Sequence, residues 1–170
     1  MAMTAAPPGL KQQYLEAFDR ESETTLKVMR AYPAEQSELR PHPTSMSARE
    51  VCWLFVAEMG AAAAAITDTM PVPPPAPPPP PATLGEVIGA YEQARKDYRA
   101  LVESTAEDAL LATFRFYVGP KTLGDVPRLQ FMWIMLNDSI HHRGQLSVYL
   151  RMTGSKVPSI YGPSRDEPWF

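Results

Sequence analysis

The chain has 170 residues, 45% of them hydrophobic and 21% charged, which is the composition of an ordinary globular protein with its own core. The net charge of −3 provides no basic surface, so we expect no nucleic-acid partner. A single cysteine excludes an internal disulfide, and neither a membrane span of about 18 apolar residues nor a secretory signal is visible, so we expect one cytoplasmic domain, residues 1–170.

Two helices are predicted in the first part of the chain. Residues 9–32 carry a broken apolar stripe with helical spacing. After a connection in which we expect His42 to be solvated, Ser47 and Glu50 match a capping box that predicts a second helix up to about Met70. The charged residues of the first helix are expected on its solvent-facing sides: Lys11, Glu16, Asp19, Arg20, Glu21 and Glu23.

The segment P-V-P-P-P-A-P-P-P-P-P, residues 71–81, predicts a polyproline II conformation. At ~3.1 Å per residue it would span on the order of 30 Å, about the length of a 20-residue helix. This length predicts that the segment runs along the bundle, so that the second and third helices are parallel. A ligand for a proline-recognition domain is the functional alternative. Thr83 and Glu86 form a second capping box, which predicts a third helix over residues 83–104.

The stretch before the last helix is harder to interpret. Alternation around Phe114 and Phe116 predicts a short extended segment packed over the bundle. Asp125 is the predicted N-cap of the last helix, with Pro127 in its first turn. The helix should stop at Gly154, and the tail that follows contains apolar side chains that we expect to be buried.

The last helix contains the residues with the clearest chemistry. Asp138 and His142 stand one turn apart, so their side chains point the same way from an otherwise apolar surface. Carboxylate oxygens and imidazole nitrogens both bind divalent transition metals. The alternative is a carboxylate that hydrogen-bonds a histidine one turn away. Two neighbouring stripes are expected to form the buried face: Phe131, Met135, Asp138, His142, Gln145 and Tyr149, and Leu129, Trp133, Leu136, Ile140, Ser147 and Leu150.

The run N-D-S-I-H-H-R-G-Q-L-S-V-Y-L-R, followed by G-S-K-V-P-S-I-Y-G, resembles the last helix and tail of the DinB-like (DinB/YfiT) family of small bacterial proteins. With the helical pattern, the resemblance implies an all-α four-helix bundle with a proline-rich connection between helices two and three and a C-terminal tail. In the family this helix reads N-H-x-x-H-H-R-G-Q, and an H-x-x-x-H pair holds a metal together with one histidine from the second helix. By position, Asp138 replaces the first histidine and His142 matches the second.

The second-helix ligand of the family stands in an E-L-x-x-H-I context, which places Leu54 at the histidine position. One turn further, Glu58 is the only charged residue in V-C-W-L-F-V-A-E-M-G-A-A-A-A-A-I, where a lone buried carboxylate is costly unless it is paired or bound to a metal. We therefore expect a substituted triad of Glu58, Asp138 and His142 that binds zinc, nickel, iron or manganese. In the rival interpretation the metal is lost and Glu58 bonds to His142 or Arg143.

Three further residues are implicated by the resemblance. His141 and Arg143 are motif residues that do not bind the metal in the family, and Arg143 is expected to anchor an anion or the tail. Tyr161 of the tail is expected near the site. The alternative is that His141 and Arg143 flank the helix and pair with acidic neighbours or a dimer mate.

Characterised relatives in the family are thiol-dependent transferases or isomerases. The resemblance therefore implies a metal-dependent enzyme, a thiol S-transferase or hydrolase, that acts as a homodimer on a low-molecular-weight thiol or another small molecule. Its catalytic residues stay unassigned. The alternative is a non-catalytic dimeric bundle, a stress-response or binding module that has lost its metal.

Overall fold

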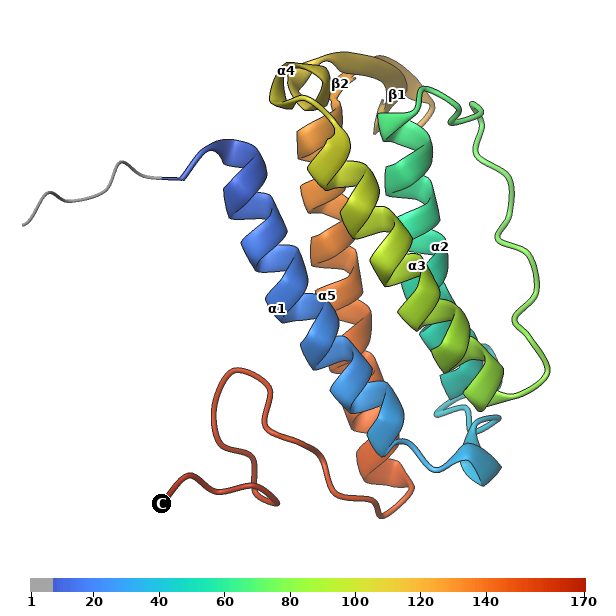
Figure 1. Cartoon of the computed structure of the whole chain (residues 1–170). Helices are drawn as coiled ribbons and strands as arrows, with labels where there is room; N and C mark the ends of the chain where they lie inside the picture. The colour runs from blue at the N-terminus through green and yellow to red at the C-terminus, as the bar shows by residue number, and fades with distance from the viewer. Residues whose placement is uncertain (1–7) are drawn as a thin grey trace, which may run out of the picture.

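The computed structural model describes residues 8–170. The expectation about a secretory signal concerns the N-terminus, and residues 1–7 lie outside the described part. Four long helices form a bundle in which α3 and α5 each pack against both α1 and α2 (Figure 1). In Figure 1, α1 and α5 run downward, whereas α2 and α3 run upward. This arrangement confirms the predicted four-helix bundle. The long helices are α1 (Leu10–Ala31), α2 (Ala48–Ile66), α3 (Leu84–Ser104) and α5 (Arg128–Met152).

Both predicted capping boxes are present. The backbone N–H of Ser47 donates to the Glu50 carboxylate at 2.7 Å, and the Ser47 hydroxyl accepts from the backbone of Glu50. Thr83 and Glu86 repeat this exchange at the start of α3. Since each N-cap side chain contributes about 1 kcal/mol, these local signals define where the two helices begin.

The proline segment returns along the outside of α2 to the start of α3, so α2 and α3 are parallel as predicted (Figure 1). Prolines have no N–H to donate, and the segment is held through its carbonyl oxygens instead. The indole N–H of Trp53 donates to the carbonyl of Pro78 at 2.7 Å, and the guanidinium of Arg49 donates to that of Pro81 at 2.5 Å.

Helix α2 is shorter than predicted, because it ends at Ile66 and not near Met70. Asp68 has a φ of 59°, a left-handed conformation that is incompatible with a continuing α-helix. At the other end of the chain, Gly154 has a φ of 78° just after α5, as expected for a helix-terminating glycine.

The segment between α3 and α5 contains a short helix, α4 (Glu107–Leu111), and two antiparallel strands, β1 (Thr113–Gly119) and β2 (Thr122–Pro127). The predicted extended stretch is therefore one half of a hairpin. The prediction that Asp125 caps the last helix is wrong, since Asp125 lies in β2 opposite Arg115 and pairs with it at 3.3 Å. Pro127 is the N-cap residue of α5.

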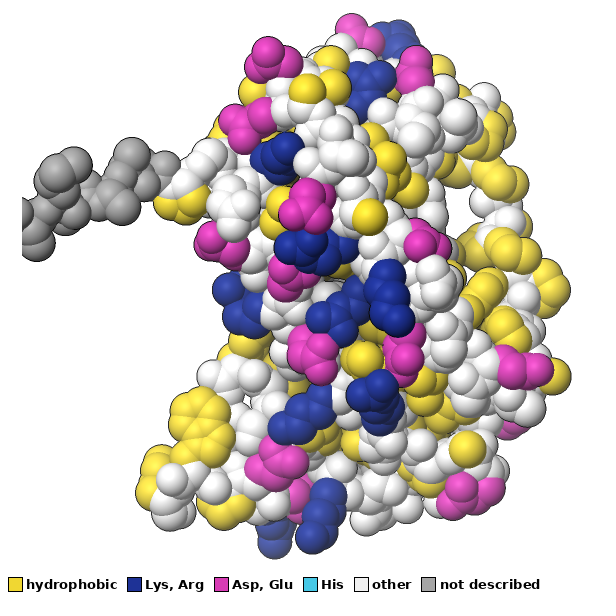
Figure 2. All heavy atoms as spheres, viewed as in Figure 1, with side chains coloured by type: hydrophobic (Ala, Val, Ile, Leu, Met, Phe, Trp, Pro, Cys, Tyr) yellow, Lys and Arg dark blue, Asp and Glu magenta, His cyan; other side chains and the backbone are white. Residues whose placement is uncertain are grey.

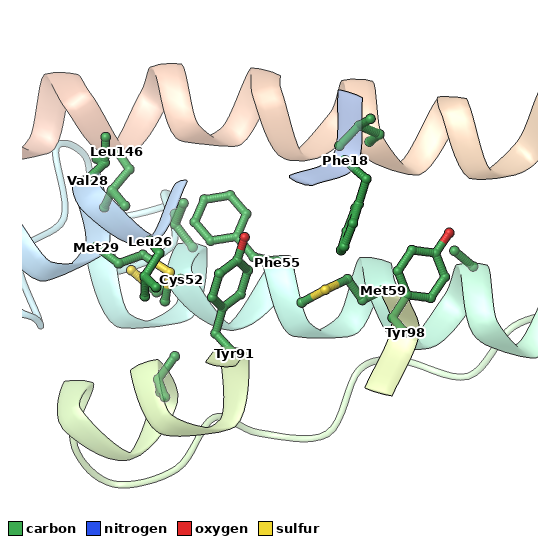
Figure 3. Packing of buried hydrophobic residues seen from close by; sticks show 14 of the residues in the cluster. Phe18, Leu26, Val28, Met29, Cys52, Phe55, Met59, Tyr91, Tyr98 and Leu146 are labelled. Atoms are coloured by element: carbon green, nitrogen blue, oxygen red, sulfur yellow. The ribbon is translucent and has the colours of Figure 1, made fainter. Parts of the chain in front are cut away.

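The core consists of aliphatic and aromatic side chains that point inward from all four long helices (Figure 3). A smaller apolar cluster joins the hairpin to the bundle, where Phe114 and Val126 pack with Phe131 of α5 and Ala65 of α2. The hairpin thus covers one end of the α2–α5 pair. None of the helices in residues 8–170 is long and apolar enough to cross a membrane.

Charged side chains follow the front of the molecule over α1 and α3 (Figure 2). They form ion pairs that join the two helices: Asp19–Arg99 at 3.0 Å, Glu23–Arg95 at 2.5 Å and Arg30–Glu92 at 2.6 Å. These pairs are largely exposed and contribute little to stability. They leave this face without an excess of either charge.

The C-terminal tail turns back toward α1 (Figure 1). Val157 and Ile160 pack against the core, but Tyr161, Trp169 and Phe170 are exposed, so the expected burial of the tail is only partly correct. An ion pair of 2.8 Å between Lys27 and Glu167 holds the tail to α1.

Candidate metal centre

The three predicted ligands lie together between α2 and α5. Each of Glu58, Asp138 and His142 offers one ligand atom, and these atoms are all within 4.8 Å of one another. His142 Nδ1 is 2.7 Å from Glu58 Oε1 and 4.0 Å from Asp138 Oδ1. The buried alanines Ala62 and Ala65 continue along α2 from Glu58 and let the helices approach closely. Asp138 and His142, one turn apart on α5, thus lie beside Glu58 of α2.

The three side chains of the site differ in exposure. The side chains of Glu58 and His142 are 8% and 15% exposed, whereas that of Asp138 is 47% exposed. The prediction that Asp138 lies on the buried face of the helix is therefore only half correct. One acid of the site is therefore buried, and the other is in contact with solvent.

Burial raises the pKa of Glu58 above its ordinary range, and hydrogen bonds from His142 and Ser139 only partly offset this effect. The hydrogen bond to Glu58 raises the pKa of His142, against the opposing effect of burial. The pair therefore retains a proton to a higher pH than either group would in water. With two acids and one base, the centre has an excess of negative charge.

One residue of the site was missed by the sequence analysis. The hydroxyl of Ser139 donates to Glu58 Oε2, so both oxygens of this carboxylate have partners on α5. The available signal was the three-residue spacing of Ser139 and His142, which puts them on adjoining parts of one helix face. Leu54, at the family's histidine position, is partly buried and provides no ligand atom.

Arg143 belongs to a different cluster, although it follows His142 directly. Its side chain is 1% exposed and points to α1, where it donates to the Glu21 carboxylate at 2.8 Å and to the Glu21 carbonyl at 3.0 Å. The Tyr161 hydroxyl accepts from Arg143 at 2.6 Å and donates to the Glu21 carboxylate at 2.7 Å. The expectation that Arg143 anchors the tail is confirmed by its contact with Tyr161. Of the two partners that the rival interpretation gave to Glu58, His142 is bonded to it and Arg143 is not.

Glu21 corrects a second expectation, since it is 5% exposed and does not lie on a solvent-facing side of α1. Burial alone would raise the pKa of Glu21, but hydrogen bonds from Tyr161 and Arg143 outweigh it and lower the pKa below its usual range. We refer to Glu21, Arg143 and Tyr161 as the tail cluster. It differs from the candidate metal centre because its one acid is compensated by arginine, by Arg143 at 2.8 Å and by the exposed Arg20 at 3.1 Å.

The two remaining histidines lie at the surface. His141 is exposed on α5, with its Nε2 atom 2.9 Å from the side-chain nitrogen of Gln145. His42 is exposed and pairs with Thr44 in its loop, as expected for a solvated residue. Neither histidine contributes a ligand atom to the group formed by the predicted triad.

The protein is thus a four-helix bundle with a candidate metal site. Its second and last long helices bring two acids and a histidine together. A model of the DinB family matches residues 1–169, and the chain belongs to this family. It is 23% identical over 154 residues to the uncharacterized protein YrdA of Bacillus subtilis strain 168, covering 91% of this chain and 89% of that protein.

Solved structures agree with this assignment at the level of the fold. A DinB-like protein from Bacillus cereus ATCC 10987 superposes with a TM-score of 0.73 and 21% identity, covering 88% of this chain and 97% of that one. The DinB-like protein YjoA from Bacillus subtilis gives a TM-score of 0.68 and 19% identity, covering 87% and 96%.

Proposed function

We propose that this protein binds a divalent transition metal through Glu58, Asp138 and His142. The observation that supports this proposal is the convergence of three ligand atoms from two helices within 4.8 Å. The chemistry of the donors also fits, since two carboxylates and one imidazole carry excess negative charge that a dication would balance. Because Glu58 is a buried acid with a raised pKa, a cation beside it would relieve the cost of burying its charge.

The donor set also bears on the choice of metal. Zinc, nickel, iron and manganese all accept a combination of carboxylate and imidazole ligands. Two hard oxygen donors in place of two family histidines shift the preference toward manganese and iron. We therefore expect the affinity for manganese and iron, relative to the affinity for zinc, to be higher at this site than at a site with three histidines.

We further propose that the metal-bound protein is a cytoplasmic, homodimeric enzyme, a thiol S-transferase or hydrolase, as its family resemblance implies. The ion would act as a Lewis acid that lowers the pKa of a bound thiol or water. Glu58, Asp138 and His142 would hold this ion, with Asp138 at the exposed side of the group.

The thiol in such a reaction has to come from outside the chain. Cys52 is the only cysteine of the sequence, and it is buried in the core. Burial raises the pKa of its thiol to about 12, so the reactive thiolate is scarcely populated at neutral pH. This observation favours a low-molecular-weight thiol as the second substrate.

A second candidate function is favoured by one observation. Both oxygens of Glu58 already have hydrogen-bond partners, His142 and Ser139, so the acid is satisfied without an ion. In this case the protein is a non-catalytic dimeric binding or stress-response module, and the former metal site is a buried polar network.

Elemental analysis of protein purified without a histidine tag separates these two candidates. We expect a stoichiometric ion in the wild type and none in Asp138→Ala or His142→Ala. The matched control is Asp125→Ala, an exposed acid of the hairpin, which should keep the metal. A metal-free wild type whose melting temperature is unchanged by manganese, iron, zinc or nickel would leave only the non-catalytic candidate.

A further inference from the structure

Ser139 makes a contact to the candidate metal centre that its position in the sequence does not require. It follows Asp138 directly, but its side chain is turned about 100° around the helix axis and faces α2. There its hydroxyl donates to Glu58 Oε2, across 81 residues of sequence. The contact thus links the two helices that form the centre.

A glutamate needs such a contact to present one oxygen in a fixed direction. Its terminal torsion has a broad energy profile, so the rotamer of Glu58 alone does not set the plane of the carboxylate. In the structure Oε2 is held by Ser139 and Oε1 by His142 Nδ1 at 2.7 Å. An ion bound by both Oε1 and Nδ1 would replace the hydrogen bond between these two atoms, whereas the contact of Ser139 to Oε2 can persist and hold the plane of the carboxylate.

The surroundings of Ser139 leave few substitutes for this hydroxyl. Ser139 and Glu58 line a small cavity of about 20 Å³ whose other walls are mostly apolar, including Met135 and Leu136 of the same helix. The phenol groups of Tyr14 and Tyr98 at its far wall are paired with each other at 2.8 Å. Among these wall residues, Ser139 is the one with a hydrogen bond to Glu58.

We propose that Ser139 is a positioning residue of the metal centre, which reserves Glu58 Oε2 and so presents Oε1 as a single, directed ligand atom. This inference rests on the proposed metal binding, and it adds a residue that acts through Glu58. Groups that orient metal ligands in this way typically change metal affinity by 10–100-fold when removed. Ser139 therefore controls affinity without contacting the ion.

The test is isothermal titration of untagged, full-length protein with Mn²⁺ and Zn²⁺ at 20 °C. We expect Ser139→Ala to bind 10–100-fold more weakly than the wild type and Ser139→Thr, which keeps the hydroxyl, to recover most of the affinity. The matched control is Ser147→Ala on the same helix, whose hydroxyl donates to the Arg143 carbonyl at 2.9 Å and should leave affinity unchanged.

Thermal unfolding of the metal-free variants separates positioning from stability. A purely structural role would lower the melting temperature of Ser139→Ala and leave affinity at 20 °C as in the wild type. This result, or failure of Ser139→Thr to recover affinity, overturns the inference while the proposed metal binding stands. A wild type that binds neither ion overturns both.

Discussion

His142 and Arg143 are neighbours in the chain, yet they belong to two polar clusters on different sides of α5. His142 faces α2 in the candidate metal centre, and Arg143 faces α1 in the tail cluster. In the tail cluster the Glu21 carboxylate meets the buried guanidinium of Arg143, and the Tyr161 phenol contacts both; the exposed Arg20 pairs with the same carboxylate at 3.1 Å. The metal centre has two acids and one imidazole, and one acid is half exposed. The two clusters thus differ in charge compensation and in exposure to solvent. The Glu21–Arg143 pair is compensated and buried, as suits a structural role, whereas the group of Glu58, Asp138 and His142 has excess negative charge and one half-exposed acid, as suits a metal ion.

The largest expected difference between the two clusters is in stability. Arg143→Met leaves the buried Glu21 carboxylate with Tyr161 and the exposed Arg20 as its remaining partners, so the loss should be about 3 kcal/mol of unfolding free energy, the lower end for a broken buried pair. Glu58→Gln keeps an acceptor for His142 and removes one of two negative charges, so its change should stay within about 1 kcal/mol. Urea denaturation followed by circular dichroism in EDTA measures both. Equal losses would show that the two clusters are energetically alike.

The second difference is the response to metal. At about 100 times the dissociation constant, Mn²⁺ should raise the free energy of unfolding by about 2.7 kcal/mol, because it binds only the folded protein. Glu58→Gln should lose this increase. Asp125→Ala, which removes an acid outside the centre, should keep it. An undiminished increase in Glu58→Gln would place the ion elsewhere.

A third, smaller effect concerns the tail. Tyr161→Phe removes the hydroxyl that bonds Arg143 and Glu21, and should cost about 1 kcal/mol, since water can replace it beside the exposed ring. Tyr117→Phe, a change of a half-exposed tyrosine on β1, is the matched control. Chemical denaturation measures the two losses, and equal values would argue against an anchoring role for Tyr161.

The smallest effect is a difference in pH dependence. The folded-state pKa of Glu21 is lowered from 4.5, so its stabilisation is complete above that value and is lost as pH falls through the lower folded pKa. Because burial opposes the hydrogen bonds, we expect a modest loss. Glu21→Gln should flatten the stability profile below about pH 4.5, measured by thermal unfolding in EDTA. The exposed Glu16→Gln should retain the wild-type slope, and a Glu21→Gln profile as steep as wild type would contradict the prediction.

Much of the bundle follows from local signals. The two capping boxes, the length of the proline segment and the glycine after α5 act over a few residues, so their outcomes could be predicted from the sequence. Of the hairpin, the alternation around Phe114 and Phe116 predicted the extended stretch of β1, but not β2, because the strand pairing depends on packing against Phe131 and Ala65. The misplaced helix start at Asp125 has the same origin, since its partner Arg115 is a cross-strand neighbour.

By itself, the sequence determined that Asp138 and His142 point the same way, because helical spacing alone brings residues i and i+4 together. It also singled out Glu58 as an acid in an apolar helix. Only the tertiary structure decided the partners. Glu58 meets Ser139 and His142 across 81 and 84 residues, and Glu21 meets Arg143 across 122, through helix packing that no local pattern encodes. The direction in which a helix faces its neighbours is a property of the whole core, and here it separates the candidate metal ligand His142 from the ion-paired Arg143 one residue away.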